Sequence, residues 1–101
     1  MSSHRIINST LIGKELDLVE SDGKTTPVII KNIMWFGSPW NCHISISYTL
    51  ESGEESCVAL SYPSNSKVDE QYCDKDGRYL NYQNKPLSIA GVYETQIIES
   101  K

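Results

Sequence analysis

Hydrophobic and polar residues alternate most clearly between residues 43 and 62, a pattern typical of half-buried antiparallel strands. Apolar side chains occupy every second position on both sides of a polar turn: Ile44, Ile46, Tyr48 and Leu50, then Val58, Leu60 and Tyr62. A three-residue loop centred on Gly53 would place Tyr48 opposite Val58, Ile46 opposite Leu60 and Ile44 opposite Tyr62. The pattern therefore predicts a hairpin with this register.

A second hairpin is predicted before it. Residues 11–20 alternate in part, Asp22-Gly23 is a strong turn signal, and residues 25–35 are rich in β-branched side chains. Leu16 would lie opposite Ile29 or Ile30, depending on the length of the turn. The apolar run 28–30 predicts burial on both faces, and Pro27 belongs at a strand start or an edge.

The remaining segments predict shorter elements. Residues 1–9 form a loose end or an edge strand, and Ser66 could cap a helical turn through Gln71. Asp76-Gly77 ends that turn or makes another hairpin, Asn84-Lys85-Pro86 is a turn, and residues 92–98 form a last strand. The chain is thus predicted to be a single all-β domain spanning 1–101. It would be a small antiparallel β-sandwich or partly open barrel of about six strands, with at most one short helix.

The stretch 35–40, Trp35-Phe36-Gly37-Ser38-Pro39-Trp40, is predicted to connect the two hairpins. Its aromatic side chains could close one end of the domain, anchor a partner or line a ligand site. If the next strand already includes residue 40, strand parity turns Trp40 inward with Ile44. We therefore expect Trp40 to be mostly buried.

Charge limits the class of partner. The net charge is −4, and the excess lies in residues 51–101, because residues 1–50 are balanced. An acidic chain disfavours nucleic acid, which is bound by clustered lysine and arginine. Neither a signal-peptide pattern nor an apolar run of membrane-spanning length occurs, so we expect a cytoplasmic protein without a membrane partner and with reduced cysteines.

Candidate chemistry is sparse. Cys42, Cys57 and Cys73 contain no C-x-x-C pair, and strand parity points Cys42 and Cys57 to opposite faces. Cys42 and His43 are strand neighbours, so they also face apart and form no nucleophile–base pair. In residues 74–85, a helix–loop–helix calcium loop would need an oxygen ligand at Arg78, a glycine at Tyr79 and a glutamate at Lys85, and all three are absent. We predict no catalytic residue, metal or cofactor, and hence no enzyme.

Binding to a basic protein is the leading functional hypothesis. Two acidic groups in loops and the aromatic stretch supply the candidate partner-binding residues: Trp35, Phe36, Trp40, Glu51, Glu54, Glu55, Asp69, Glu70, Asp74 and Asp76. The concrete version is a small acidic inhibitor, such as an immunity protein that occludes a basic toxin. A small-ligand-binding β-barrel and an enzyme with a site assembled from scattered residues are the alternatives. The acidic loops could also be ordinary solvated turns, and the oligomeric state stays open.

Overall fold

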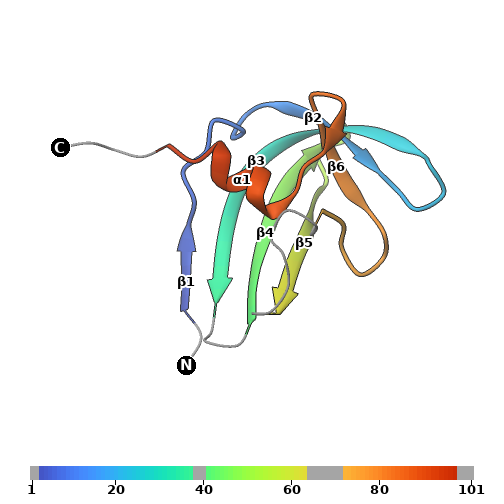
Figure 1. The fold of residues 1–101 in the computed structure, drawn as a ribbon. Helices are drawn as coiled ribbons and strands as arrows, with labels where there is room; N and C mark the ends of the chain where they lie inside the picture. The colour runs from blue at the N-terminus through green and yellow to red at the C-terminus, as the bar shows by residue number, and fades with distance from the viewer. Residues whose placement is uncertain (1–2, 38–40, 64–71, 98–101) are drawn as a thin grey trace.

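The computed structural model describes residues 3–37, 41–63 and 72–97. Within them, seven antiparallel strands form one sheet, and one short helix packs on it (Figure 1). The strands are β1 (Ser3–Ile6), β2 (Glu15–Val19), β3 (Thr25–Gly37), β4 (Asn41–Leu50), β5 (Glu55–Pro63), β6 (Tyr79–Tyr82) and β7 (Lys85–Pro86), followed by helix α1 (Ile89–Glu94). Their order is β5-β4-β3-β2-β6-β7, and β1 also pairs with β3. The all-β prediction is confirmed.

Three turns share one design, in which glycine takes the last position of a three-residue loop. Gly23, Gly53 and Gly77 have φ of +89°, +92° and +80°. Each glycine N–H donates to the carbonyl oxygen of the residue before the loop, at 2.8, 2.9 and 3.1 Å. This is a type I turn completed by a left-handed residue, a conformation that glycine adopts without steric cost.

This turn design corrects both predicted registers. Leu16 lies opposite Val28, rather than Ile29 or Ile30. In the second hairpin every predicted pair is displaced by two residues: Ile44 faces Leu60, Ile46 faces Val58 and Tyr48 faces Ser56. The prediction placed Gly53 at the centre of the three-residue loop. In the structure the positive φ occurs at the third residue of the loop, so Gly53 is the last loop residue and Ser52 is the centre. A shift of two residues preserves side-chain faces, and five of the predicted inner residues are buried, namely Ile44, Ile46, Tyr48, Val58 and Leu60, while Leu50 is partly buried.

A β-bulge at Lys31 shapes the core. The register of β3 against β4 shifts between Ile30 and Asn32, so that Ile30 and Ile33 both point inward although they are three residues apart. Ile29 is 42% exposed, so the prediction that run 28–30 is buried on both faces is wrong. Sixteen buried apolar side chains of the described residues form one core cluster, to which strands β2 to β6, the loop at Leu11 and helix α1 all contribute.

The edge of β3 that faces away from β4 is covered twice. β2 pairs with its first half, and β1 pairs with residues 34–37, which confirms the prediction of an edge strand near the N-terminus. Between them the chain loops out and buries Leu11 in the core. Ser9 is also buried there, where its hydroxyl hydrogen bonds to that of Thr95 just after α1, at 2.7 Å.

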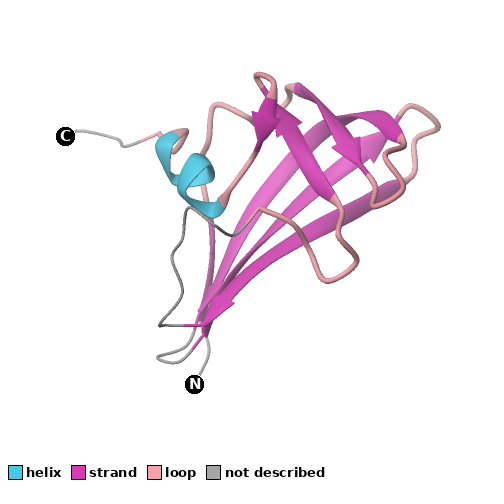
Figure 2. Ribbon diagram, turned by 45° about the vertical axis from the view of Figure 1, so that its right-hand side comes forward, coloured by secondary structure: helices cyan, strands magenta, loops and turns pink. Residues whose placement is uncertain are grey.

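The last described segment is helical where the sequence predicted a strand over 92–98. Ser88 caps α1 by accepting a hydrogen bond from the Gly91 N–H at 3.0 Å, and Ile89 and Val92 are both buried. The i, i+3 spacing of these two residues suits a helix that covers the inner face of the sheet (Figures 1 and 2). The turn predicted at 84–86 is instead the two-residue loop Gln83-Asn84, and the helical turn predicted at 66–71 lies outside the described residues.

Arg78 links the start of β6 to the edge strand β5. Its side chain, just before β6, donates to the carbonyl oxygen of Cys57 in β5 at 3.4 Å. β5 and β6 lie far apart in the strand order, so the sheet must curl to bring them together. The result is the partly open barrel named among the predicted architectures.

Candidate functional site

The three glycine turns lie together at one end of the barrel. The end of β2, the start of β3 and the end of β4 are neighbours in the sheet, and β6 begins opposite Val19 at the end of β2. A side chain on Gly77 would meet the Cβ of Ser21 at 3.3 Å, which shows that two of the turns touch. In Figure 1, β3 and β4 run from this end at upper right to the opposite end at lower left.

This end concentrates negative charge, and we call it the acidic end. Segments 20–24, 50–55 and 74–78 carry seven carboxylates and three cations: Glu20, Asp22, Glu51, Glu54, Glu55, Asp74 and Asp76 against Lys24, Lys75 and Arg78. The local imbalance equals the net charge of the whole chain, −4. A cation approaching the molecule is therefore attracted chiefly to this end.

A hollow of about 370 Å³ opens between the turns. Leu18, Tyr48 and Leu50 line it together with charged side chains from all three turns: Glu20 from the first, Glu54 and Glu55 from the second, and the Arg78 guanidinium from the third. Leu18 and Tyr48 also belong to the barrel core, so the hollow stands on rigid structure. Three carboxylates against one guanidinium leave the hollow net negative, and apolar surface beside them suits the long stem and charged head of a lysine or arginine side chain.

Asp74 and Arg78 hold the third turn in place. The Asp74 carboxylate accepts hydrogen bonds from the N–H groups of Asp76 and Arg78, each at 2.9 Å, and from Arg78 Nε at 3.0 Å. Burial alone would lower the pKa of Arg78, but the hydrogen bond and charge of Asp74, with weaker contributions from Tyr48 and Asp76, raise it above its usual value. Arg78 thus stays charged at every pH below that value.

The predicted acidic residues divide into two groups. Glu51, Glu54 and Asp76 are exposed at the acidic end and are available to a partner. Glu55 pairs with Lys31, and the Asp74 side chain is only 6% exposed, so these two carboxylates serve contacts within the molecule. Asp69 and Glu70 lie outside the described residues.

The predicted aromatic residues lie at the other end. Trp35 and Phe36 belong to β3 itself, rather than to a connector, because the pairing of β3 with β4 continues to Gly37 and Cys42. Trp35 packs against the core, whereas Phe36 stacks on His43 with ring centroids 4.8 Å apart. Trp40 lies outside the described residues, so its predicted burial stays a prediction.

The acidic and aromatic groups therefore form separate surfaces. Val28 lies opposite Leu50 at the acidic end, and Phe36 follows eight residues later along β3. At roughly 3.3 Å per residue, the strand between them is about 26 Å long. One small contact patch would not include both groups.

Sequence reasoning missed part of the acidic end. Glu20 and Asp22 were not proposed as partner-binding residues, because residues 1–50 balance in charge when they are counted as a block. The detectable signal was the repeated turn: acidic residues accompany a glycine in Asp22-Gly23, Glu51-Ser52-Gly53 and Asp76-Gly77. Antiparallel hairpins joined along one sheet bring alternate turns to the same end.

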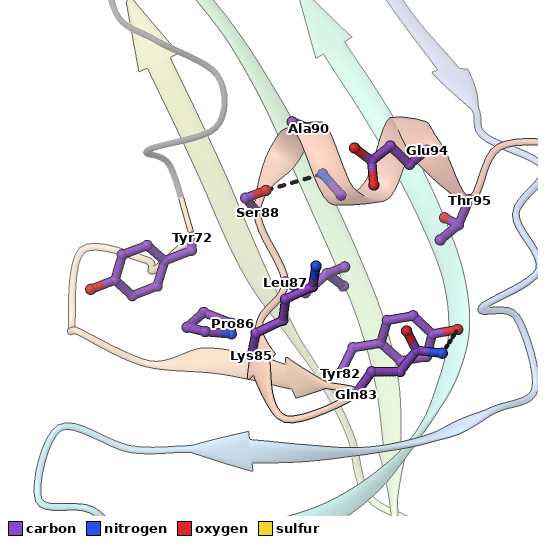
Figure 3. Close-up of a pocket in the computed structure, with 11 residues that line it drawn as sticks. Tyr72, Tyr82, Gln83, Lys85, Pro86, Leu87, Ser88, Ala90, Glu94 and Thr95 are labelled. Carbon is purple, nitrogen blue, oxygen red and sulfur yellow. Dashed lines mark hydrogen bonds between the residues drawn. The ribbon is translucent and has the colours of Figure 1, made fainter.

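A second and larger hollow, of about 490 Å³, lies between the β6–β7 hairpin and α1 (Figure 3). Tyr82 and Pro86 line it from the hairpin, Ala90 and Glu94 line it from the helix, and Tyr72 stands at one side. We call it the hairpin–helix groove. Its lining includes none of the predicted site residues.

Other candidate chemistry is dispersed. Cys57 and Cys73 are free, exposed thiols, and within the described ranges no three His, Cys, Asp or Glu side chains are grouped so as to hold a metal ion. No helix in those ranges has the length and apolar character needed to cross a membrane. Comparison with models of protein families, with curated proteins and with solved structures finds no match to this chain.

Proposed function

We propose that the protein is a non-catalytic binding domain whose acidic end docks onto a basic protein partner. The observation that carries the proposal is the gathering of three acidic turns at one end of the barrel, beside a hollow lined by three carboxylates, one guanidinium and three apolar or aromatic side chains. Complementary charge steers a basic partner into encounter, and apolar contact in the hollow would then slow its dissociation. The finer version is a cytoplasmic inhibitor, such as an immunity protein, that covers the basic active surface of a toxin.

The rigidity of the turns supports this proposal. A backbone hydrogen bond closes each of the three turns at its glycine, and the Lys24 N–H also donates to the Asp22 carboxylate at 2.9 Å. Carboxylates on hydrogen-bonded turns lose little conformational freedom on binding, so more of their attraction appears as affinity. Disordered acidic loops would lack this advantage.

The barrel-ligand alternative is less well supported. A small-ligand barrel of this kind requires an interior or mouth with room for a molecule. The interior here is filled by sixteen buried apolar side chains. The two hollows described above lie at the acidic end and between the β6–β7 hairpin and α1, rather than within this core.

Affinity capture with matched variants tests the proposal. The protein would be immobilised and exposed to extract from its own source, with bound proteins eluted by salt and identified. Glu20→Gln with Glu54→Gln removes two carboxylates from the hollow, whereas Glu15→Gln with Asp17→Asn removes two from the exposed outer side of β2. We expect a basic partner whose affinity falls at least about tenfold in the first variant and changes little in the second.

Two results would count against the proposal. One is equal loss of the partner in both variants, which would indicate general attraction to net charge. The other is a partner that stays bound with unchanged affinity when Glu20 and Glu54 are neutral. Raising the salt concentration gives an independent check, because an electrostatically steered complex should associate more slowly at high ionic strength.

A further inference from the structure

The hairpin–helix groove is open because small residues face it and the backbone holds its walls apart. Gln83 and Asn84 have φ of +54° and +67°, and this tight turn folds β7 back along β6. Leu87 then donates its N–H to the Leu80 carbonyl at 2.7 Å and is buried beneath the groove. On the helix side the lining includes Ala90 and Gly91, whose small size leaves the space unfilled.

Two unpaired opposite charges face this space. Lys85 and Glu94 are both exposed and line the groove from opposite walls. The described residues make two ion pairs, Lys31 with Glu55 and Arg78 with Asp74, and neither involves Lys85 or Glu94. In Figure 3, Lys85 reaches from the hairpin toward the helix, and the Glu94 carboxylate projects from the helix.

Aromatic and polar groups complete the lining. Tyr72 is 41% exposed, and its ring is held edge-on against Tyr79 with centroids 5.6 Å apart. Tyr82 packs partly against the core, and its hydroxyl accepts a hydrogen bond from Gln83 Nε2 at 3.5 Å. Tyrosine rings present flat apolar surface with a polar tip, a combination suited to a ligand that is part apolar and part polar.

We infer that the groove binds a small zwitterion with an apolar or aromatic body, of the chemical class of a free amino acid or a short peptide. The ligand's carboxylate would pair with Lys85, its ammonium group with Glu94, and its side chain would pack on the tyrosines and Pro86. A simple anion would be attracted by Lys85 but repelled by Glu94, and a simple cation the reverse, so a ligand that carries both charges gains more than either. A volume of about 490 Å³ falls within the range of ordinary ligand pockets, roughly 300–1,000 Å³.

This site is independent of the acidic end. The linings of the groove and of the acidic hollow have no residue in common. Changes at Glu20 and Glu54 should therefore leave zwitterion binding unaffected. If either proposal fails its test, the other still stands.

Titration of isotope-labelled protein followed by NMR tests the inference with four probes. L-phenylalanine and L-phenylalanyl-L-phenylalanine carry both charges, N-acetyl-L-phenylalanine lacks the ammonium group, and L-phenylalaninamide lacks the carboxylate. We expect saturable amide shifts in residues 82–95 with one or both zwitterions, and binding at least about tenfold weaker for each blocked probe. The comparison of phenylalanine with its dipeptide distinguishes an amino-acid site from a peptide site.

Charge-specific variants sharpen the test. Lys85→Gln should weaken the binding of L-phenylalanine at least about tenfold, but it should hardly change the already weak binding of L-phenylalaninamide, which has no carboxylate. Glu94→Gln should likewise weaken the binding of L-phenylalanine and hardly change that of N-acetyl-L-phenylalanine, which has no ammonium group. Lys24→Gln and Glu51→Gln, at the acidic end, serve as controls and should have no effect. Equal binding of all four probes would overturn the inference. So would shifts outside the groove, or no saturable shift with either zwitterion up to its solubility limit.

Discussion

Removing the Asp74 side chain should open the third turn and loosen the closure of the barrel. The Asp74 side chain is only 6% exposed, and its carboxylate accepts three hydrogen bonds. One of these comes from Arg78, the residue that reaches across to the Cys57 carbonyl on β5. Asp74→Ala would therefore release two backbone N–H groups and leave Arg78 without its counter-charge.

The expected cost follows from those contacts. A hydrogen bond to a charged group contributes about 1.5–3 kcal/mol, and removal of one partner of a buried ion pair costs about 3–5 kcal/mol. The Arg78 side chain is 28% exposed, so water can replace part of what it loses. We expect a loss of about 2–4 kcal/mol in the free energy of unfolding, which corresponds to about 10–20 °C in Tm for a domain of this size.

Urea unfolding followed by circular dichroism would measure this loss. Asp74→Asn keeps a carbonyl oxygen for the backbone N–H groups and should have an intermediate effect. Asp76→Ala, two residues away and exposed, should stay within about 0.5 kcal/mol of the wild type. If Asp74→Ala and Asp76→Ala were equally mild, Asp74 would be an ordinary surface carboxylate and the assignment of a structural role would be wrong.

Three further stability predictions concern individual contacts. Gly53→Ala should cost about 1–2 kcal/mol in urea unfolding, because φ is +92° there; a neutral result would contradict the turn assignment. Gly37→Ala should cost about 1–3 kcal/mol of unfolding free energy, because the new methyl group would overlap the Trp35 indole. Most of that cost should disappear when the same substitution is made in the Trp35→Leu variant. A cost that is the same in both proteins would refute the overlap. Lys31→Met should change stability by no more than about 1 kcal/mol, because Lys31 and Glu55 are 49% and 55% exposed; a larger loss would mean that this pair is part of a wider network.

The sequence predicted the inner faces of the strands better than their partners. Alternation alone identifies Ile44 and Ile46 as inner residues, and any even shift in register leaves that result unchanged. Pairing depends on which loop position has positive φ. In both hairpins the glycine is the third residue of the loop. A three-residue loop centred on the glycine, or a two-residue loop of the glycine and the residue before it, therefore pairs the wrong residues.

The bulge and the helix lay beyond sequence reasoning for a different reason. Nothing in the local sequence marks Lys31 as the extra residue, because the benefit of the bulge, burial of both Ile30 and Ile33, arises only against β4. Residues 89–94 contain a glycine and few polar residues, which resembles a strand after a turn. Their helical form depends on the Ser88 cap and on the core that Ile89 and Val92 meet.

The sequence indicates which residue types a binding site would use, but it does not indicate where in the fold those residues lie. The sequence shows that several loops are acidic, but only the topology shows that Glu20 and Glu54 line one hollow and that Trp35 lies at the far end of the sheet. Chain position alone could not provide this, because it depends on how hairpins lie side by side. The hairpin–helix groove was missed entirely, since its walls come from a segment predicted as a turn and a strand.

The most direct test of the proposed function is an amide footprint of the protein in complex with its captured partner, by hydrogen exchange or NMR. We predict that protection appears in segments 20–24, 50–55 and 74–78 together, and that residues 35–37 and 43 are unaffected. A footprint confined to Trp35, Phe36 and His43, with the three turns unchanged, would contradict the assignment of the acidic end as the docking surface.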